Sequence, residues 1–458
     1  MYVTQLHEAI RRKYDISLYN YGSLIYNEYP HKSCWNPEFS EGDYRNILDS
    51  LGTTGNPLLL YIHIPFCPRQ CFYCLCNTII TSDHDTIRRY LDHLESEIAL
   101  ITDIFKKSGS KPSFRRVHLG GGSPSFLKHP DFDRLLSSLG SLMNVSALDE
   151  FTLEVDVRGL AEQDLLYFRS KGVTRLSFGI QDLDSDVQRA INRIQPPDMV
   201  RSLLTPAVRS AFNSINFDLL CGLPKQTSES FSRTLDTVLE FAPDRIMLMF
   251  LSYAPEVKKH QRHMKPAVIP DMDSRMEVYD LAVERLLKHG YIRIGVDHFA
   301  IHNNDLTQAM HNKSIRWNTL GYVPEQVLDI LGIGIGSSSF LASSCYAQNV
   351  YDMAEYEKAV SSGFLPLLRG HLLSDEDRLR NELMNEIRCY LTVDIPAFSL
   401  RHHFNFTEYF AREWSDLKAL EDDGLVRLAD NRLTVTELGR NYTGIILRIF
   451  DTYRRKAD

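Results

Sequence analysis

Short apolar runs alternate with longer amphipathic segments from residue 58 to about residue 296, and this alternation constrains the fold more than any other feature. The apolar runs predict strands at residues 58–64, 116–119, 151–157, 175–180, 215–220, 245–251 and 291–296. Helical periodicity predicts helices between them, at residues 86–105, 131–142, 161–171, 184–192, 229–241 and 273–289. Strands that alternate with helices form parallel sheets. Six or more such units therefore predict an α/β protein with a full or partial (β/α) barrel.

Polar residues or glycines stand where each predicted strand ends. In chain order they are a cysteine-rich stretch, Gly120-Gly121-Gly122, Glu154 and Asp156, Gln181 and Asp182, Asp218, Ser252 and Tyr253, and Asp297 and His298. Each residue alone could simply begin a surface loop. In a (β/α) barrel, however, the carboxyl ends of the strands meet at the face that carries the chemistry. Together these residues predict one shared pocket.

Four of the eight cysteines lie within ten residues, directly after the first predicted strand: Cys67, Cys71, Cys74 and Cys76. Thiolate sulfur is a soft ligand that selects zinc, Cu(I) or an iron–sulfur centre. Clusters that only transfer electrons usually have four cysteine ligands. Three ligands at the Cys-x3-Cys-x2-Cys interval would instead leave one iron of a [4Fe-4S] cluster open for a substrate or cofactor.

Three other interpretations of these cysteines remain open. A free cysteine is often a small buried apolar residue, although that does not explain the clustering. A zinc site usually has a second ligand pair, and no further Cys-x-x-Cys pair follows in the sequence. Disulfides are typical of small secreted domains, whereas this chain is long and its remaining cysteines are scattered.

The chain has 458 residues, which exceeds what one hydrophobic core usually supports. We expect an N-terminal arm at 1–55, the barrel core with its extension at 56–363, and a C-terminal helical domain at 364–458. In that last domain, helices at 375–390, 407–423 and 437–454 surround a hairpin at 424–436, an arrangement that resembles a winged helix. Winged helices often bind DNA, but fold alone does not establish function.

Composition restricts the partners. The net charge of −8 argues against a general nucleic-acid binder, because phosphate contacts need an excess of Lys and Arg. The sequence shows no signal peptide and no apolar run near the length of a membrane span. We therefore expect a cytoplasmic monomer that binds neither nucleic acid nor membrane.

The motifs resemble those of radical S-adenosylmethionine (SAM) enzymes and, within that superfamily, the oxygen-independent coproporphyrinogen III oxidase (dehydrogenase) family. The matching stretches run from the first strand to the last helix, at residues 61–67, 71–77, 120–125, 154–156, 179–182, 192–193, 218–227, 295–300, 321–322, 345–349 and 451–453.

The resemblance implies a role for each motif. Cys67, Cys71 and Cys74 would bind three irons of a [4Fe-4S] cluster, and SAM would bind the fourth through its amino and carboxylate groups. Cys76 is then not an iron ligand, and it is a candidate catalytic residue together with Tyr61. The residues implied to bind SAM are Tyr61, Gly121, Gly122, Glu154, Gln181, Arg193 and Asp218. Each polar side chain among them could instead end a loop or form an ion pair, and Tyr61 could be a core aromatic.

The residue types suit SAM. Glycine lets the backbone approach a ligand where any Cβ would obstruct it. Carboxylates accept hydrogen bonds from hydroxyl and ammonium groups, and arginine pairs with a carboxylate.

Four stretches depart from the family pattern, and in one of them the proline of the family's Glu-Val-Asp-Pro is Val157 here. The arginine of the family's Arg-Tyr-x-x-Tyr-Pro arm is Ile25 here. The family's Asn-Phe-Gln triplet, whose Phe and Gln belong to the site of a second SAM, reads Asn318-Thr319-Leu320. After the sixth strand the family's Asn-Tyr-Ala-His is replaced by residues 250–253, Phe-Leu-Ser-Tyr. The cluster and first-SAM motifs are kept, while the departures fall on the substrate side.

The resemblance implies a radical SAM enzyme that cleaves SAM to a 5′-deoxyadenosyl radical and decarboxylates the propionates of coproporphyrinogen III without oxygen, in haem biosynthesis. The alternative is a radical SAM C-methyltransferase or cyclopropanase that uses a second SAM on a natural product; a non-catalytic haem or cluster carrier is a third hypothesis. The expected partners are a small-molecule substrate, a tetrapyrrole or another scaffold, and an external electron donor such as flavodoxin or ferredoxin. Candidate partners for substrate propionates are His31, Lys32, Arg69, His298 and Arg316.

Overall fold

The computed structural model describes residues 2–17, 26–53, 55–324 and 329–453. Its centre is a curved twelve-stranded sheet in the order β16-β15-β14-β13-β1-β4-β5-β6-β7-β8-β10-β9. Seven neighbouring strands are parallel. They are β13 (Asp329–Ile333), β1 (Pro57–Ile64), β4 (Ser113–Gly121), β5 (Glu150–Val155), β6 (Arg175–Gln181), β7 (Ser214–Cys221) and β8 (Arg245–Phe250). In the described part of the chain β1 and β8 do not pair, so the barrel is partial. The first six predicted strands are confirmed.

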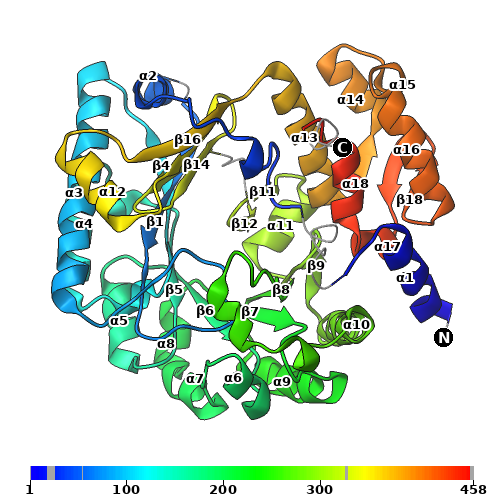
Figure 1. Cartoon of the computed structure of the whole chain (residues 1–458), viewed down its shortest axis with the longest axis horizontal. Coiled ribbons are helices and arrows are strands. Elements are labelled where there is room, and N and C mark those ends of the chain that lie inside the picture. Colours follow the sequence, from blue (N-terminus) through cyan, green and yellow to red (C-terminus); the bar gives the residue numbers. More distant parts are fainter. Residues whose placement is uncertain (1, 18–25, 54, 325–328, 454–458) are drawn as a thin grey trace.

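Helices cover the outer face of the parallel strands (Figure 1). They are α3 (His84–Ser108), α4 (His129–Leu139), α5 (Glu162–Ser170), α6 (Ser185–Ala190), α7 (Pro197–Leu203), α8 (Pro206–Ala211), α9 (Ser228–Phe241) and α10 (Met272–Lys288). Their starts follow ordinary capping rules. Asp83, for example, accepts hydrogen bonds from the first-turn N–H groups of Asp85 and Thr86, which the helix leaves unpaired.

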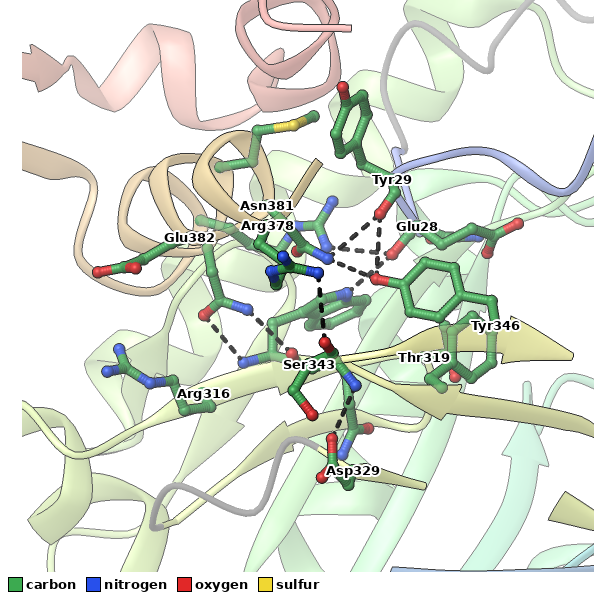
Figure 2. A pocket seen from close by; sticks show the side chains of 18 of the residues that line it. Glu28, Tyr29, Arg316, Thr319, Asp329, Ser343, Tyr346, Arg378, Asn381 and Glu382 are labelled. Carbon is green, nitrogen blue, oxygen red and sulfur yellow. Dashed lines mark hydrogen bonds between the residues drawn. The ribbon is translucent and has the colours of Figure 1, made fainter. Parts of the chain in front are cut away.

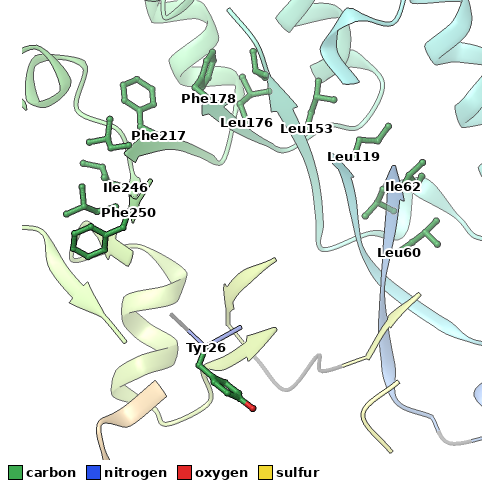
Figure 3. Packing of buried hydrophobic residues seen from close by; sticks show 14 of the residues in the cluster. Tyr26, Leu60, Ile62, Leu119, Leu153, Leu176, Phe178, Phe217, Ile246 and Phe250 are labelled. Atoms are coloured by element: carbon green, nitrogen blue, oxygen red, sulfur yellow. The ribbon is translucent and has the colours of Figure 1, made fainter. Parts of the chain in front are cut away.

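Side chains along the strands alternate between two environments, because a strand has a period of two residues. Leu60 and Ile62 are fully buried against the helices, whereas Tyr61 points to the inner face. The same outward layer continues along the sheet (Figure 3) through Leu119, Leu153, Leu176, Phe178, Phe217, Ile246 and Phe250. The alternate positions carry polar side chains at the barrel interior, and they supply much of the site described below.

The seventh predicted strand, at residues 291–296, is only partly correct. The chain forms β9 (Ile292–Ile294), which pairs with β10 (His298–Ala300) and not with β8; β10 is antiparallel to both. Gly295 has φ +52°, and an added Cβ there would lie 2.1 Å from the Tyr322 ring. The close approach of this ring explains why glycine begins the turn and the strand ends early.

An extension that the sequence patterns did not predict continues the sheet beyond β1, and it is antiparallel from β14 onwards. It consists of β13 (Asp329–Ile333), parallel to β1, followed by β14 (Ser338–Leu341), β15 (Cys345–Asn349) and β16 (Leu367–Leu372), with α12 (Met353–Ser361) before β16. Helix α11 (Asp305–His311) and a hairpin of β11 (Arg316–Asn318) and β12 (Gly321–Val323) precede it. Because β16 belongs to this sheet, we propose that the C-terminal domain begins after Leu372 rather than at residue 364.

The C-terminal domain combines helices with a three-stranded sheet in the order β17-β19-β18. Its elements are α13 (Asp375–Tyr390), β17 (Thr392–Asp394), α14 (Ile395–His402), α15 (Phe406–Tyr409), α16 (Ala411–Asp422), β18 (Val426–Ala429), β19 (Arg432–Val435), α17 (Glu437–Arg440) and α18 (Thr443–Ile449). The predicted helix at 407–423 is divided at Phe410, and the one at 437–454 is divided after Arg440. Gly439 lies against the main chain of Leu425, where an added Cβ would meet its carbonyl oxygen at 1.8 Å. This contact fixes α17 against the hairpin.

The N-terminal arm lies against the C-terminal domain. Helix α1 (Tyr2–Lys13) is next to α17 and α18 in Figure 1, and the Tyr442 hydroxyl lies 2.6 Å from His7 Nδ1. The second arm helix, α2 (Glu41–Ser50), packs on α3. None of the described helices combines the length and apolar character needed to cross a bilayer.

Candidate active site

A cavity of about 540 Å³ opens at the carboxyl ends of the parallel strands. We call it the barrel cavity. Ten of the eleven site residues predicted from the sequence line it: Cys67, Cys71, Cys74, Cys76, Gly121, Gly122, Glu154, Gln181, Arg193 and Asp218. The remaining one, Tyr61, is not part of the described cavity wall. The barrel topology explains this convergence, since these residues end five neighbouring strands.

The cysteine loop begins at β2 (Phe66–Cys67) and ends at β3 (Ile79–Ile80), and these two short strands pair with each other. All four of its cysteines are free thiols. The Cys71 sulfur accepts hydrogen bonds from Arg158 at 3.4 Å and Arg193 at 3.6 Å. Burial raises the pKa of the Cys67 thiol to about 12, so a cationic centre would be needed to keep it as thiolate.

The arrangement fits a cluster better than a single ion. A single zinc would need all of its sulfur ligands within about 2.3 Å of one point. A four-iron cluster gives each cysteine a separate iron, so free cysteines spread around one cavity match it.

A segment that the sequence analysis missed holds the cysteine loop in place. Lys258 Nζ donates to the main-chain oxygen of Cys76 at 3.0 Å, and His260 Nε2 lies 2.7 Å from the oxygen of Cys74. Buried Gln261 donates to the oxygen of Tyr73 at 2.9 Å. We call residues 254–265 the clasp. The only sequence signal was a run of basic residues, which does not reveal what it contacts.

The glycine triplet brings bare backbone to the cavity. Gly121 has φ +112°, and an added Cβ would lie 2.5 Å from the His63 ring. At Gly122 a Cβ would meet the main chain of Pro65 at 2.7 Å. Since neither position can accommodate a Cβ, glycine is required at both for the triplet to pack against His63 and Pro65.

Glu154 joins the glycine triplet to the inner face of the sheet. Its carboxylate accepts hydrogen bonds from His118 Nε2 at 2.9 Å and from the Gly121 N–H at 3.1 Å. Burial alone would raise the pKa of Glu154, but these two donors outweigh it and lower the pKa. Glu154 is therefore an anion held at the cavity wall.

Tyr61 lies on the inner face of the sheet, next to the rings of His63 and His118. Its hydroxyl is 2.9 Å from His63 Nδ1, and His63 Nε2 donates to the main-chain oxygen of Asn77 at 2.8 Å. Burial lowers the pKa of His63, so the ring is neutral and its Nδ1 accepts from Tyr61. An added Cβ at Gly120 would meet the Tyr61 ring at 3.0 Å. Tyr61 therefore packs against the glycine triplet.

Gln181 and Asp218 present acceptors to the cavity. Gln181 adopts the left-handed region (φ 64°) where β6 ends, and its buried Oε1 has no hydrogen-bond partner. A strained residue with an orphaned acceptor is typical of a ligand site. Asp218 accepts from Asn216 at 2.7 Å, and burial with the nearby Glu154 charge raises its pKa.

Arg193 is the buried cation of the site. It donates to the Gly179 oxygen at 2.7 Å and to Asp156 at 3.1 Å, in addition to the Cys71 sulfur. Its guanidinium is thus fixed against both the cysteine loop and β6, where a carboxylate in the cavity could pair with it.

A second cavity of about 460 Å³ lies between the N-terminal arm, the β11–β12 hairpin and α13 (Figure 2). We call it the arm cavity. Asn27, Trp317 and Thr319 line both cavities, so the two are neighbours. Opposite ends of the chain build this region, because the Tyr26 hydroxyl donates to Asp451 at 2.6 Å.

Three arginines line the arm cavity, and they differ in the contacts that their side chains make. Arg378 donates to the Leu373 oxygen at 2.7 Å, and Arg388 lies over the Trp317 ring at 4.7 Å. Arg316 has no side-chain hydrogen bond or ion pair within the described residues, and Figure 2 shows it apart from Arg378. Arg316 is therefore the cation available to a ligand.

The other predicted propionate partners are distributed unevenly. Arg69 is exposed at the barrel cavity and likewise has no described partner. His298 is buried and bonds Asp297 at 2.7 Å, while His31 and Lys32 lie outside the described walls of both cavities. The departure at Ile25 lies outside the described residues. Of the other departures, Thr319 and Leu320 line the barrel cavity, and so do Phe250, Leu251 and Ser252.

Comparisons with known proteins agree with this geometry. The radical SAM superfamily model matches residues 61–238, and the HemN C-terminal domain model matches residues 373–442. The oxygen-independent coproporphyrinogen III oxidase of Pseudomonas aeruginosa is 32% identical over 444 residues, which cover 96% of this chain and 95% of the relative. The enzyme of that name from Escherichia coli is 34% identical over 441 residues, with the same coverage of 96% and 95%.

The solved structure of Escherichia coli coproporphyrinogen III oxidase, described as a radical SAM enzyme, superposes with a TM-score of 0.88 at 33% identity. The match covers 93% of this chain and 97% of that one. It therefore extends over the barrel, the extension and the C-terminal domain together.

Proposed function

The chain belongs to the oxygen-independent coproporphyrinogen III oxidase family of radical SAM enzymes, and we propose that it decarboxylates the propionate side chains of a coproporphyrinogen-type tetrapyrrole. The family uses a [4Fe-4S] cluster and SAM as cofactors. When bound, these cofactors supply a 5′-deoxyadenosyl radical that can take hydrogen from an unactivated carbon.

We assign Cys67, Cys71 and Cys74 as the iron ligands, because their spacing leaves one iron for SAM. Arg158 and Arg193 donate hydrogen bonds to the Cys71 sulfur and so offset part of the negative charge of the thiolates. Cys76 is exposed and takes no iron in this assignment.

The cavity wall offers SAM complementary groups. The fixed anion Glu154 and the orphaned Gln181 oxygen can accept from ammonium or hydroxyl groups. Arg193 can pair with a carboxylate, and Asp218 can accept from a ribose hydroxyl. Gly121 and Gly122 allow close approach, while Tyr61 positions them through His63 and Gly120.

The observation that carries the substrate assignment is the arm cavity beside the barrel cavity. A tetrapyrrole is too large for a pocket that also holds SAM, and its propionates need cationic partners on more than one side. Arg69 in the barrel cavity and Arg316 in the arm cavity are two cations with no described partner. They can replace the family arginine whose position is Ile25 here.

A reducing compartment such as the cytoplasm suits this chemistry, since all eight cysteines are free. We propose a monomer that receives electrons from an external donor. The alternative of a methyltransferase or cyclopropanase has less support, because the family relatives that cover nearly the whole chain are oxidases by name.

The direct test is to mix anaerobic, reduced, cluster-loaded protein with SAM and coproporphyrinogen III. We expect carbon dioxide and protoporphyrinogen IX together with 5′-deoxyadenosine. Formation of 5′-deoxyadenosine and S-adenosylhomocysteine with unchanged porphyrinogen would refute the substrate and favour a methyl-transfer reaction.

The role of Arg316 can be tested separately. Arg316→Gln should raise the KM for the tetrapyrrole about tenfold or more, because it removes one charge-assisted contact worth roughly 1.5–3 kcal/mol. Binding of SAM should not change. Arg427→Gln, a substitution of an exposed arginine on β18, is the matched control and should leave the KM unchanged.

A further inference from the structure

The clasp stands out by its charge. Between residues 254 and 265 the sequence has four Lys or Arg side chains and two histidines, but only one carboxylate, Glu256. The chain as a whole is acidic, with a net charge of −8. A local basic patch on an acidic protein produces a field that can select an oppositely charged partner.

The clasp touches the cysteine loop directly. As described above, Lys258, His260 and Gln261 hold three of its main-chain oxygens. In addition, the His263 ring stacks on Phe72, with centroids 4.7 Å apart. The clasp therefore packs directly on the cysteine loop.

The outer side of the clasp has no role inside the molecule. Lys259, Arg262 and Lys265 are exposed, and none of them lines the barrel cavity or the arm cavity. Arg262 makes one contact, to the main-chain oxygen of Pro255 at 3.2 Å, which leaves its charge facing solvent. These cations are therefore not placed to bind SAM or the tetrapyrrole.

We propose that the exposed cations of the clasp are the docking surface for an acidic protein that donates single electrons to the cluster. This inference rests on the proposed cluster in the cysteine loop. Charge complementarity favours such a partner, because opposite charges accelerate encounter and orient the two proteins. The transfer oxidises the donor by one electron and reduces the cluster by one, and no bond forms or breaks.

The test compares two double charge reversals in cluster-loaded protein without substrate. Lys259→Glu with Lys265→Glu changes the docking surface, and both side chains are exposed. The control, Lys106→Glu with Lys107→Glu, makes the same charge change in the last turn of α3. That turn leads into β4, so it lies at the amino-terminal ends of the parallel strands, whereas the cysteine loop follows the carboxyl end of β1.

The rate of cluster reduction is followed by absorbance after mixing with reduced flavodoxin, an acidic one-electron donor. At low ionic strength the clasp variant should be reduced about tenfold more slowly than wild type, and the control should match wild type. In about 1 M salt the difference should largely vanish, because the Debye length falls to about 3 Å. Photoreduced 5-deazariboflavin, a small uncharged reductant, should reduce all three proteins equally fast.

Two results would overturn the proposal. One is a clasp variant that flavodoxin reduces at the wild-type rate, or a control that is slowed as much. The other is a clasp variant that is also slow with the small reductant, which would place the defect in the cluster itself. Neither measurement uses the tetrapyrrole, so the outcome does not depend on the proposed substrate.

Discussion

Substitution of Gly121 by alanine tests whether the glycine triplet forms part of the cofactor site. The position has φ +112°, which costs an L-residue with a Cβ roughly 1–2 kcal/mol. The new Cβ would also lie 2.5 Å from the His63 ring, and overpacking of this kind costs about 1–3 kcal/mol more. We therefore expect Gly121→Ala to lower the free energy of unfolding by about 2–5 kcal/mol.

Gly290→Ala is the matched control. Gly290 has φ +85°, and a Cβ there would meet nothing within 4 Å. The free energy of unfolding of Gly290→Ala should fall only by the backbone contribution of a positive φ, about 1–2 kcal/mol. The difference between the two variants isolates the steric contact with His63, since both pay a similar conformational cost.

The assay has two parts. Urea unfolding of both variants gives the stability difference, and equilibrium binding of SAM to the cluster-loaded proteins gives the functional one. Movement of His63 would disturb Tyr61 and Asn77, to which it is bonded, and also the Gly121 N–H that holds Glu154. We expect SAM affinity to fall at least about tenfold in Gly121→Ala, which is about 1.4 kcal/mol, and to be unchanged in Gly290→Ala. Equal stabilities and equal SAM affinities in the two variants would refute this reasoning.

Three further predictions concern other parts of the structure. Burial alone would raise the pKa of Asp377, but hydrogen bonds from His371, Ser374 and Tyr453 lower it to about 2. The ionised Asp377 therefore contributes its full share of folding stability above about pH 5, and this contribution is lost as pH falls towards 2. Asp377→Asn should accordingly lose about 2 kcal/mol at neutral pH in urea unfolding, with the gap closing in acid; a gap that widens in acid would contradict the assignment. Gln261→Ala removes the hydrogen bonds to the main-chain oxygens of Tyr73 and Ser252, so it should lower the free energy of unfolding by about 2–4 kcal/mol. It should also lower the iron content of the protein. An unchanged iron content would show that the clasp does not support the cluster. Arg158→Gln removes an N–H donor and a positive charge from beside the Cys71 sulfur, so the reduction potential of the cluster should fall. A redox titration followed by electron paramagnetic resonance measures this potential, and a higher value than in wild type would contradict the prediction.

Local patterns were sufficient to predict the first six parallel strands and several of the side chains that line the barrel cavity. Each strand is an apolar run with a polar end, and a (β/α) barrel brings all such ends together, so Glu154, Gln181 and Asp218 could be placed in one cavity without knowledge of contacts. Gly121 was identified by the resemblance, while its physical reason, the close His63 ring, is visible only in the structure.

Features that depend on distant contacts were not predictable. The early end of β9 results from the Tyr322 ring, which is 27 residues away in the sequence from Gly295. The clasp contacts the cysteine loop across more than 180 residues, as the bond between Lys258 and Cys76 shows. Tyr61 lies against Gly120, 59 residues away in the sequence, where an added Cβ would come within 3.0 Å of its ring. In each case a tertiary contact decides the outcome, and no periodicity records it.

The central claim is that three cysteines of the loop bind the cluster while the fourth does not. The most direct measurement is the iron and acid-labile sulfide content of four variants after anaerobic reconstitution, in which Cys67, Cys71, Cys74 and Cys76 are each replaced by alanine. We predict that the first three variants lose the cluster, whereas Cys76→Ala keeps it and still shows a change in its paramagnetic resonance spectrum when SAM is added. Equal loss of iron in all four variants, or retention in any of the first three, would contradict the account.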